Sequence, residues 1–106
     1  MDIELDEGTG DTEYLHVLNQ HVLDVQTKVI PDIVFYLAGV DVVEGDRYGR
    51  LNLSRSGLQK REQFILGLMK RLSLPVVILM SGGYATTPGI TADLHAEVHR
   101  AAYTFY

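Results

Sequence analysis

The chain has 106 residues, 46% of them hydrophobic, and a net charge of −5 with acidic and basic residues interspersed. This length supports one small core and no second domain, and the lack of a Lys/Arg block argues against nucleic-acid binding. The absence of cysteine excludes disulfides and thiolate metal sites. No apolar run approaches the roughly 20 residues of a membrane span, and the first residues are acidic, unlike the basic start of a signal peptide. We therefore expect a soluble, cytoplasmic protein without a membrane partner.

Residues 1–10 alternate apolar and acidic side chains before ending in glycines, which fits a short edge strand or a mobile arm. Asp11 or Thr12 can cap the helix that follows. Apolar residues then recur at helical spacing and predict an amphipathic helix that ends before Pro31 and packs against a sheet: Leu15, Leu18, Val22, Val25 and Val29.

Residues 33–38 form an apolar run without alternation, which is typical of a strand covered on both faces. The run continues through Gly39 to the carboxylate of Asp41. Residues 39–53 have the composition of a functional loop, because they combine glycines, acids and an aromatic ring. These are Gly39, Asp41, Glu44, Gly45, Asp46, Tyr48 and Gly49.

Ser54 is a plausible cap for a second helix, which ends in the basic pair Lys70-Arg71. The predicted core face of this helix consists of Leu58, Ile65, Leu68 and Leu72, flanked by Phe64 and Met69. A second apolar run, residues 76–80, stops at the turn Ser81-Gly82-Gly83-Tyr84. Residues 86–89 are expected to form a turn before a closing helix marked by Ile90, Leu94, Val98, Ala101 and Phe105.

The order helix, strand, helix, strand, helix, with residues 1–10 as an optional first strand, predicts an α/β fold with parallel strands. Ligands of such sheets bind beyond the carboxyl ends of the strands, where Asp41 and the turn at residues 81–84 would both emerge. Two strands make a very small sheet. We therefore expect the chain to be part of a larger unit.

Taken alone, these residues also allow structural interpretations. An Asp after a strand is most often a turn former or a helix cap, and Tyr84 alone would be a half-buried packing ring. His95 and His99 lie four residues apart, the spacing of a two-histidine metal site, but lack the Glu of a metalloprotease helix. We interpret this pair as a solvated flank of the closing helix.

Two motifs resemble the C-terminal part of a zinc-dependent histone deacetylase. The first is residues 37–51, with its Gly-x-Asp-x4-Asp pattern and the wording Glu-Gly-Asp-Arg, followed by Gly57 and Arg61-Glu62. The second is Pro75 with Ser81-Gly82-Gly83-Tyr84. The wording is most similar to the class IV branch and its bacterial relatives, and the resemblance covers most of the chain, from about Glu4 to the last helix.

This resemblance implies a partial three-layer arginase/deacetylase-like fold, in which zinc is held by two aspartates and one histidine and an acyl-lysine amide is hydrolysed. Asp41 matches one zinc ligand, and a carboxylate suits it because oxygen ligands leave the ion Lewis acidic. Tyr84 matches the tyrosine that donates to the oxyanion, and Gly82 and Gly83 let the backbone approach the acyl group. The resemblance places Tyr48 where the family usually lines its substrate channel with an aliphatic residue.

Asp46 matches a second family acid, which we expect to hold its loop, with Gly39 and Gly45, and not to bind zinc. The family's Asp-x-His and His-His motifs lie upstream of the matched region and are absent from this chain. His16, His21, His95 and His99 fall at none of those positions. We therefore expect residues 1–106 to be one partial domain that lacks its N-terminal segment, binds no zinc alone and is inactive alone.

The alternative is a non-catalytic α/β module that pairs with another copy through its open sheet edge. A third class, a small metal or nucleotide binder, is disfavoured because neither the phosphate-loop pattern nor Gly-x-Gly-x-x-Gly is present.

Overall fold

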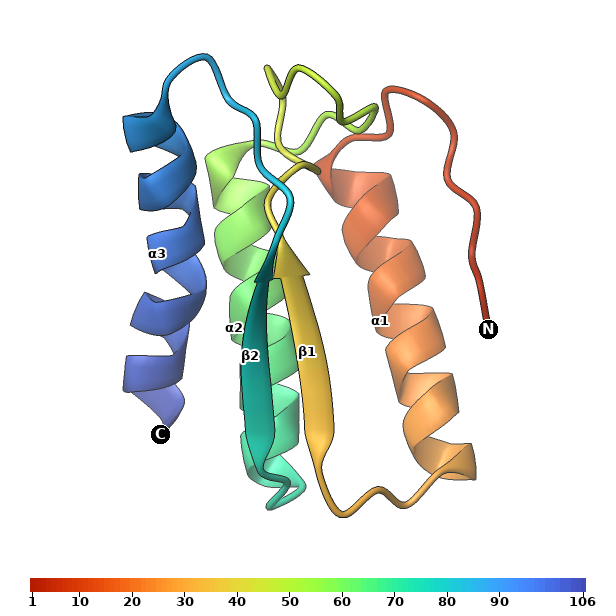
Figure 1. The fold of residues 1–106 in the computed structure, drawn as a ribbon. Coiled ribbons are helices and arrows are strands. Elements are labelled where there is room, and N and C mark those ends of the chain that lie inside the picture. Colours follow the sequence, from red (N-terminus) through yellow and green to blue (C-terminus); the bar gives the residue numbers. More distant parts are fainter.

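The computed structural model describes residues 1–106 and contains three helices and two strands (Figure 1). In chain order these are α1 (Asp11–Lys28), β1 (Val34–Gly39), α2 (Arg55–Arg71), β2 (Val76–Ser81) and α3 (Pro88–Phe105). The strands pair in parallel, in a register that runs from Val34 opposite Val76 to Gly39 opposite Ser81. The predicted α/β class, element order and parallel pairing are confirmed. None of the helices combines the length and apolar character needed to cross a bilayer.

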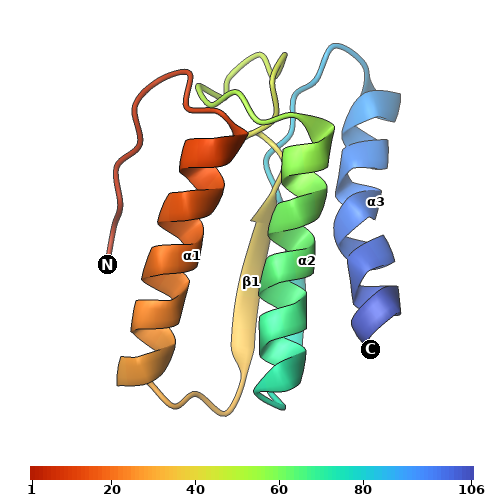
Figure 2. The same cartoon turned by 180° about the vertical axis from the view of Figure 1, so that it is seen from behind.

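All three helices lie on the same face of the sheet, with α2 directly against the strands and α1 and α3 on either side of it (Figures 1 and 2). The other face is bare. Burial alternates along β1, since Ala38 is buried whereas Phe35 and Leu37 are 62% and 64% exposed. The apolar run predicted a strand covered on both faces. Within these 106 residues only one face is covered.

The core is centred on α2, which is buried along most of its length. Leu66 packs with Ala38 of β1 and with Val98 and Ala101 of α3. A second cluster faces α1 and consists of Ile65, Leu68 and Met69. Helix α2 packs against the sheet on one side and against α1 and α3 on two further sides, so its apolar surface extends beyond a single stripe. The core face predicted from the sequence therefore omitted Leu66, which is fully buried. It included Leu72, which follows the last turn of α2 and is 40% exposed.

Helix α1 contributes less to the core than its apolar spacing predicted, because none of its residues is fully buried. Leu18 and Val22 pack against the cluster on α2, but Val25 and Val29 are exposed. The predicted caps are also wrong, since Gly10 precedes the helix and forms no side-chain cap. Asp11 instead accepts hydrogen bonds from the backbone N and the Oγ of Ser54, at 2.8 and 2.5 Å. It therefore joins the start of α1 to the start of α2.

The other helix caps follow local sequence. Ser54 accepts from the backbone N of Gly57 at 3.0 Å, as predicted for the start of α2. Thr87 accepts from the backbone N of Ile90 at 3.2 Å, and Pro88 is the first residue of α3. Residues 88 and 89 were expected to belong to a turn and are in the helix, because a proline in the first helical turn sacrifices no hydrogen bond.

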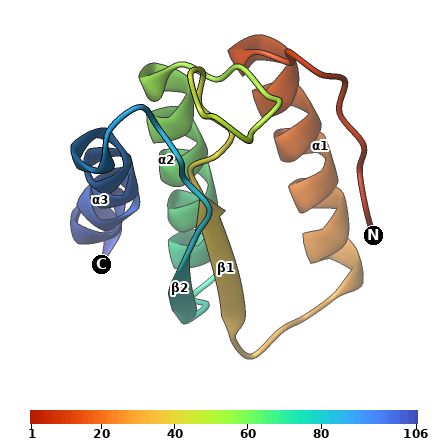
Figure 3. The same ribbon diagram turned by 45° about the horizontal axis from the view of Figure 1, so that its top comes forward.

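Residues 1–10 form no strand and run beside α1 (Figure 1). They are held to the loop between β1 and α2 by two backbone hydrogen bonds, from Gly8 N to Arg50 O at 2.7 Å and from Asn52 N to Thr9 O at 2.9 Å. That loop is stiffened by a bridge between the buried residues Val43 and Leu53. The loop and the connection from β2 to α3 both lie beyond the carboxyl ends of the strands (Figures 1 and 3).

Candidate functional site

The carboxyl ends of β1 and β2 bring Asp41 against the first glycine of the turn at residues 81–84. Gly39 is paired with Ser81, and Val40 N donates to Ser81 O at 3.3 Å, so the two strands leave the sheet together. A Cβ atom built on Gly82 would lie 2.8 Å from Asp41 Cγ, closer than such atoms pack. Asp41 and Gly82 are therefore neighbours although 41 positions separate them in sequence.

Both glycines of the turn are needed for conformation and for space. Gly82 and Gly83 have φ angles of 61° and 105°, which side chains disfavour. A Cβ on Gly83 would lie 2.7 Å from Val40 Cγ2 and 2.8 Å from Thr91 Cγ2. The turn is thus pressed between the residues following β1 and the first turns of α3. Gly39 adjoins the same place, since a Cβ there would be 3.1 Å from Asp41 Oδ1.

Tyr84 follows the glycines and presents its ring to the surface, where it is 55% exposed. Its ring meets that of Tyr48 edge to face, with centroids 5.0 Å apart and planes at 85°. The phenol oxygen of Tyr84 takes part in none of the hydrogen bonds formed within the chain. Two aromatic side chains from distant segments therefore lie together beside the strand ends, and both phenols are free to donate.

Asp46 connects the loop after β1 to the backbone of Tyr84. Its Oδ1 accepts from the backbone N of Tyr48 and Gly49 at 2.9 and 2.8 Å, and its Oδ2 accepts from Tyr84 N at 2.7 Å. Burial acts to raise the pKa of this carboxyl, but the three N–H donors and the nearby Arg47 outweigh it and hold the pKa below its usual value. Arg47 N also donates to Tyr84 O at 2.9 Å.

Two further glycines shape this loop. Gly45 has a φ of 84° and open space around it, so glycine is required there only for the backbone conformation of the turn. At Gly49 a Cβ would overlap the carbonyl group of Asp41. The loop therefore folds back closely onto the backbone of Asp41.

Sequence reasoning missed the role of His95. This ring was interpreted as part of a solvated flank, but its Nε2 lies 3.0 Å from Gly82 O and its Nδ1 is buried without a partner. His99, one turn later, is exposed. The only sequence signal for His95 was its place one turn after Thr91 on a helix following the glycine turn, and that spacing does not reveal which carbonyl it faces.

The residues of this chain do not by themselves form a zinc site. No group of three or more His, Asp or Glu side chains is placed to hold a metal ion. Asp41 is a single carboxylate whose neighbours in the turn are glycines. What the strand ends supply chemically is one exposed carboxylate, that of Asp41, and the two exposed phenols of Tyr48 and Tyr84.

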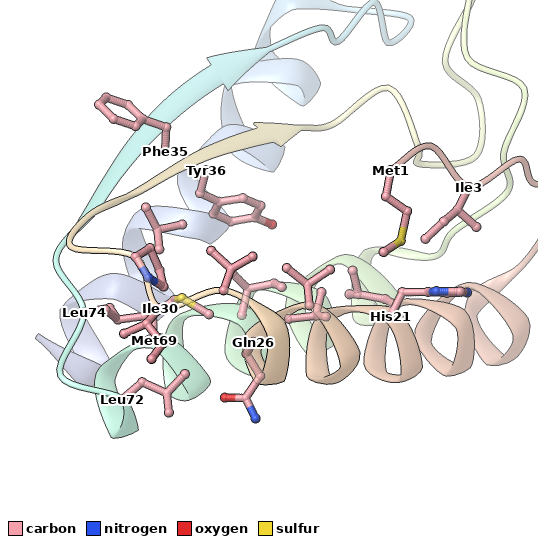
Figure 4. Close-up of a pocket in the computed structure, with 17 residues that line it drawn as sticks. Met1, Ile3, His21, Gln26, Ile30, Phe35, Tyr36, Met69, Leu72 and Leu74 are labelled. Carbon is pink, nitrogen blue, oxygen red and sulfur yellow. The ribbon is translucent and has the colours of Figure 1, made fainter.

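An apolar groove lies elsewhere, between α1, the edge of β1 and α2 (Figure 4). This groove has a volume of about 550 Å³, and 14 of the 17 residues that line it are hydrophobic. Met1 and His21 lie toward one end, and Met69 and Leu74 toward the other (Figure 4). With few polar groups, it is suited to packing against another polypeptide element and not to acid–base chemistry.

Residues 1–101 match the histone deacetylase domain family. An uncharacterized protein of Picosynechococcus is 40% identical over all 106 residues, which make up 35% of that protein. Histone deacetylase 2 of Arabidopsis thaliana is 33% identical over 82 residues, covering 77% of this chain and 21% of the relative.

Among solved structures, the crystal structure of the HDA15 HD domain resembles this fold with a TM-score of 0.67 at 21% identity. The match covers 93% of this chain and 26% of that one. The chain therefore spans about a third, or less, of the length of these relatives.

Proposed function

The chain belongs to the histone deacetylase family, and we propose that it supplies Asp41 and Tyr84 to the active site of a zinc-dependent hydrolase of acyl-lysine or a related amide. One observation carries this proposal. The paired ends of β1 and β2 place the Asp41 carboxyl against Gly82, two residues before the exposed ring of Tyr84. A potential metal ligand and a hydrogen-bond donor thus stand at the same edge of the sheet.

In this proposal Asp41 is one ligand of a site whose other ligands lie outside the 106 residues. Two features support this division. The chain has no cluster of three metal-binding side chains. All 106 of its residues match the Picosynechococcus protein, but they cover only 35% of that protein. The missing ligands, together with the groups that handle the proton, would come from the rest of the deacetylase domain.

Tyr84 would donate its phenol hydrogen to the oxyanion that develops as the acyl group is attacked. Such a donor contributes on the order of 3 kcal/mol to transition-state stabilisation. The structure favours this role because the backbone of Tyr84 is held at both its N–H and its carbonyl whereas the phenol is free. Gly82 and Gly83 would place their backbone beside the acyl group while the turn packs against Asp41 and α3, and Tyr48 would form a wall of the substrate channel.

Asp46 is proposed to position Tyr84 and not to bind metal. Both of its carboxyl oxygens already accept hydrogen bonds from backbone N–H groups, which tie the side chain to its own loop and to Tyr84. Gly45 and Gly39 serve the same loop through the turn that they permit and the space that they leave.

The test uses the complete deacetylase that contains this chain, assayed for zinc content and for turnover of an acetyl-lysine peptide. Asp41→Asn is expected to lower zinc content and to abolish turnover. Tyr84→Phe is expected to keep zinc and lose roughly 10²-fold in kcat, as removal of an oxyanion donor does. Asp32→Asn, at the opposite end of β1 and exposed, is the matched control.

Two results would contradict the proposal. One is full zinc content and activity in Asp41→Asn. The other is turnover by the pure 106-residue chain, because one carboxylate cannot complete the site.

A second candidate is a non-catalytic module that pairs with another copy of itself. It is favoured by the exposed Phe35 and Leu37 and by the edge of β1 that no strand pairs. Sedimentation velocity of the isolated chain distinguishes it. A concentration-dependent dimer that Phe35→Lys dissociates would support self-pairing, whereas a monodisperse monomer would exclude it.

A further inference from the structure

The segment Gly82–Ala85, here called the tyrosine segment, is held by α3 on one side. His95 Nε2 lies 3.0 Å from Gly82 O, and Thr91 Oγ1 accepts from Ala85 N at 3.1 Å. Thr91 and His95 are four residues apart and so lie on one face of α3, a turn apart. One helix face thus binds the backbone just before and just after Tyr84.

The hydrogen bond from His95 fixes the chemistry of its ring. A carbonyl oxygen only accepts, so Nε2 must carry the hydrogen and donate it to Gly82 O. The other nitrogen, Nδ1, is buried and has no partner. The ring therefore has one hydrogen bond available in this position, and that bond goes to the glycine turn.

Gly83 makes this approach possible. A Cβ on Gly83 would lie 3.2 Å from His95 Nε2, tighter than almost all such contacts, so a side chain there would push the ring away from Gly82 O. The absence of a side chain at Gly83 therefore allows the His95 ring to reach Gly82 O.

We propose that His95 is a positioning residue, which fixes the Gly82 carbonyl and thereby the orientation in which the turn presents Tyr84. Two consecutive glycines have more backbone freedom than any other pair, and the bond from His95 is the hydrogen bond that restrains the carbonyl between them. The effect of His95 on catalysis rests on the proposed function, because it acts through Tyr84. Its effect on the backbone of the tyrosine segment does not.

The first experiment is NMR on the 106-residue chain and needs no activity. The ¹⁵N shifts of His95 are expected to show the Nε2–H tautomer, with a coupling across the hydrogen bond to the Gly82 carbonyl carbon. His95→Leu is expected to raise amide exchange at Tyr84 and Ala85 about tenfold, because a local opening then breaks one hydrogen bond fewer. Amides in the core of α2 should not change.

Two variants separate positioning from packing. His95→Gln retains an N–H donor at a similar reach and is expected to restore slow exchange, and His99→Leu, one turn along and exposed, is the matched control. An Nδ1–H tautomer in the unsubstituted chain would overturn the proposal even if the Leu variant failed to fold. Unchanged exchange in His95→Leu, or equal loss in the Leu and Gln variants, would also overturn it.

The second experiment places the same variants in the complete deacetylase. Displacement of a catalytic group by about 1 Å can cost 10²-fold, so His95→Leu is expected to lower kcat 10- to 100-fold with KM unchanged, and His95→Gln to recover most of it. If Tyr84→Phe proves fully active while the NMR results hold, the catalytic role proposed for Tyr84 fails and the positioning role of His95 stands. If Tyr84→Phe is inactive and His95→Leu retains full kcat, only the catalytic importance of His95 is refuted.

Discussion

Replacement of Asp46 by Asn tests whether this carboxylate anchors Tyr84. Oδ1 of Asp46 accepts from Tyr48 and Gly49, whereas Oδ2 accepts from Tyr84 N. Asn keeps one oxygen and replaces the other by an NH₂ group. The oxygen is expected to stay with the two local donors, which leaves NH₂ facing the N–H of Tyr84, so the long-range hydrogen bond is lost and the two local ones persist.

The expected loss of stability follows from the kind of bond removed. A hydrogen bond to a charged acceptor contributes about 1.5–3 kcal/mol, and water can replace part of it at this partly exposed position, so we expect a loss of about 1–2 kcal/mol. The pKa of Asp46 is lowered in the folded chain. The stability that it contributes is therefore complete above its ordinary pKa of 3.8 and decreases as pH falls below that value.

The assay is urea unfolding followed by circular dichroism at pH 7 and at pH 3, with amide exchange of Tyr84 as the local probe. Glu44→Gln is the matched control, because it removes the same charge from an exposed residue of the same loop. A stability of Asp46→Asn within about 0.5 kcal/mol of the unsubstituted chain would refute the contribution of this hydrogen bond. An equal loss in Glu44→Gln would show that the loss comes from the charge and not from the hydrogen bond.

Three further predictions test the buried polar groups between α2 and β1 and the glycine turn. Glu62→Leu should lower the free energy of unfolding by about 3–5 kcal/mol, since it leaves the buried guanidinium of Arg61 unpaired, and Arg61→Met with Glu62→Leu should recover most of that in urea unfolding. Burial and the neighbouring carboxylate of Glu62 raise the pKa of the Tyr36 phenol well above 10, against the lowering effect of Arg61. The unfolded chain therefore loses this proton at a lower pH than the folded chain does. Stability should fall as pH rises above about 10, and Tyr36→Phe should remove that slope. Gly82→Ala should cost more than Gly45→Ala, which costs about 1–2 kcal/mol for backbone conformation alone, because only at Gly82 does a Cβ also meet a neighbouring side chain; equal losses in unfolding experiments would refute the contact.

The position of the candidate site could be predicted because parallel strands end at the same edge of a sheet. The glycine and the carboxylate after residues 33–38, and the turn after residues 76–80, were therefore expected to emerge side by side, and the register of Gly39 with Ser81 places them so. That prediction needed only two apolar runs and the crossover rule. It did not need side-chain detail.

Contacts between distant side chains could not be predicted in the same way. Asp11 looked like a local helix cap, yet its carboxylate binds Ser54, 43 residues away. His95 looked like a solvated residue, yet its ring binds Gly82 O. A polar side chain at the start or on the flank of a helix has several possible partners, and which one it finds depends on how the helices pack.

The sequence by itself determined the α/β class, the parallel strands and the sheet edge at which Asp41 and the turn at residues 81–84 emerge, because those follow from hydrophobic spacing, glycines and chain connectivity. Only the tertiary structure shows that one sheet face is uncovered, that Asp46 accepts a hydrogen bond from the backbone of Tyr84 and that His95 of α3 contacts the carbonyl of Gly82. The physical reason is that local pattern specifies which face of an element is apolar, whereas the partner of each polar group is selected by three-dimensional proximity.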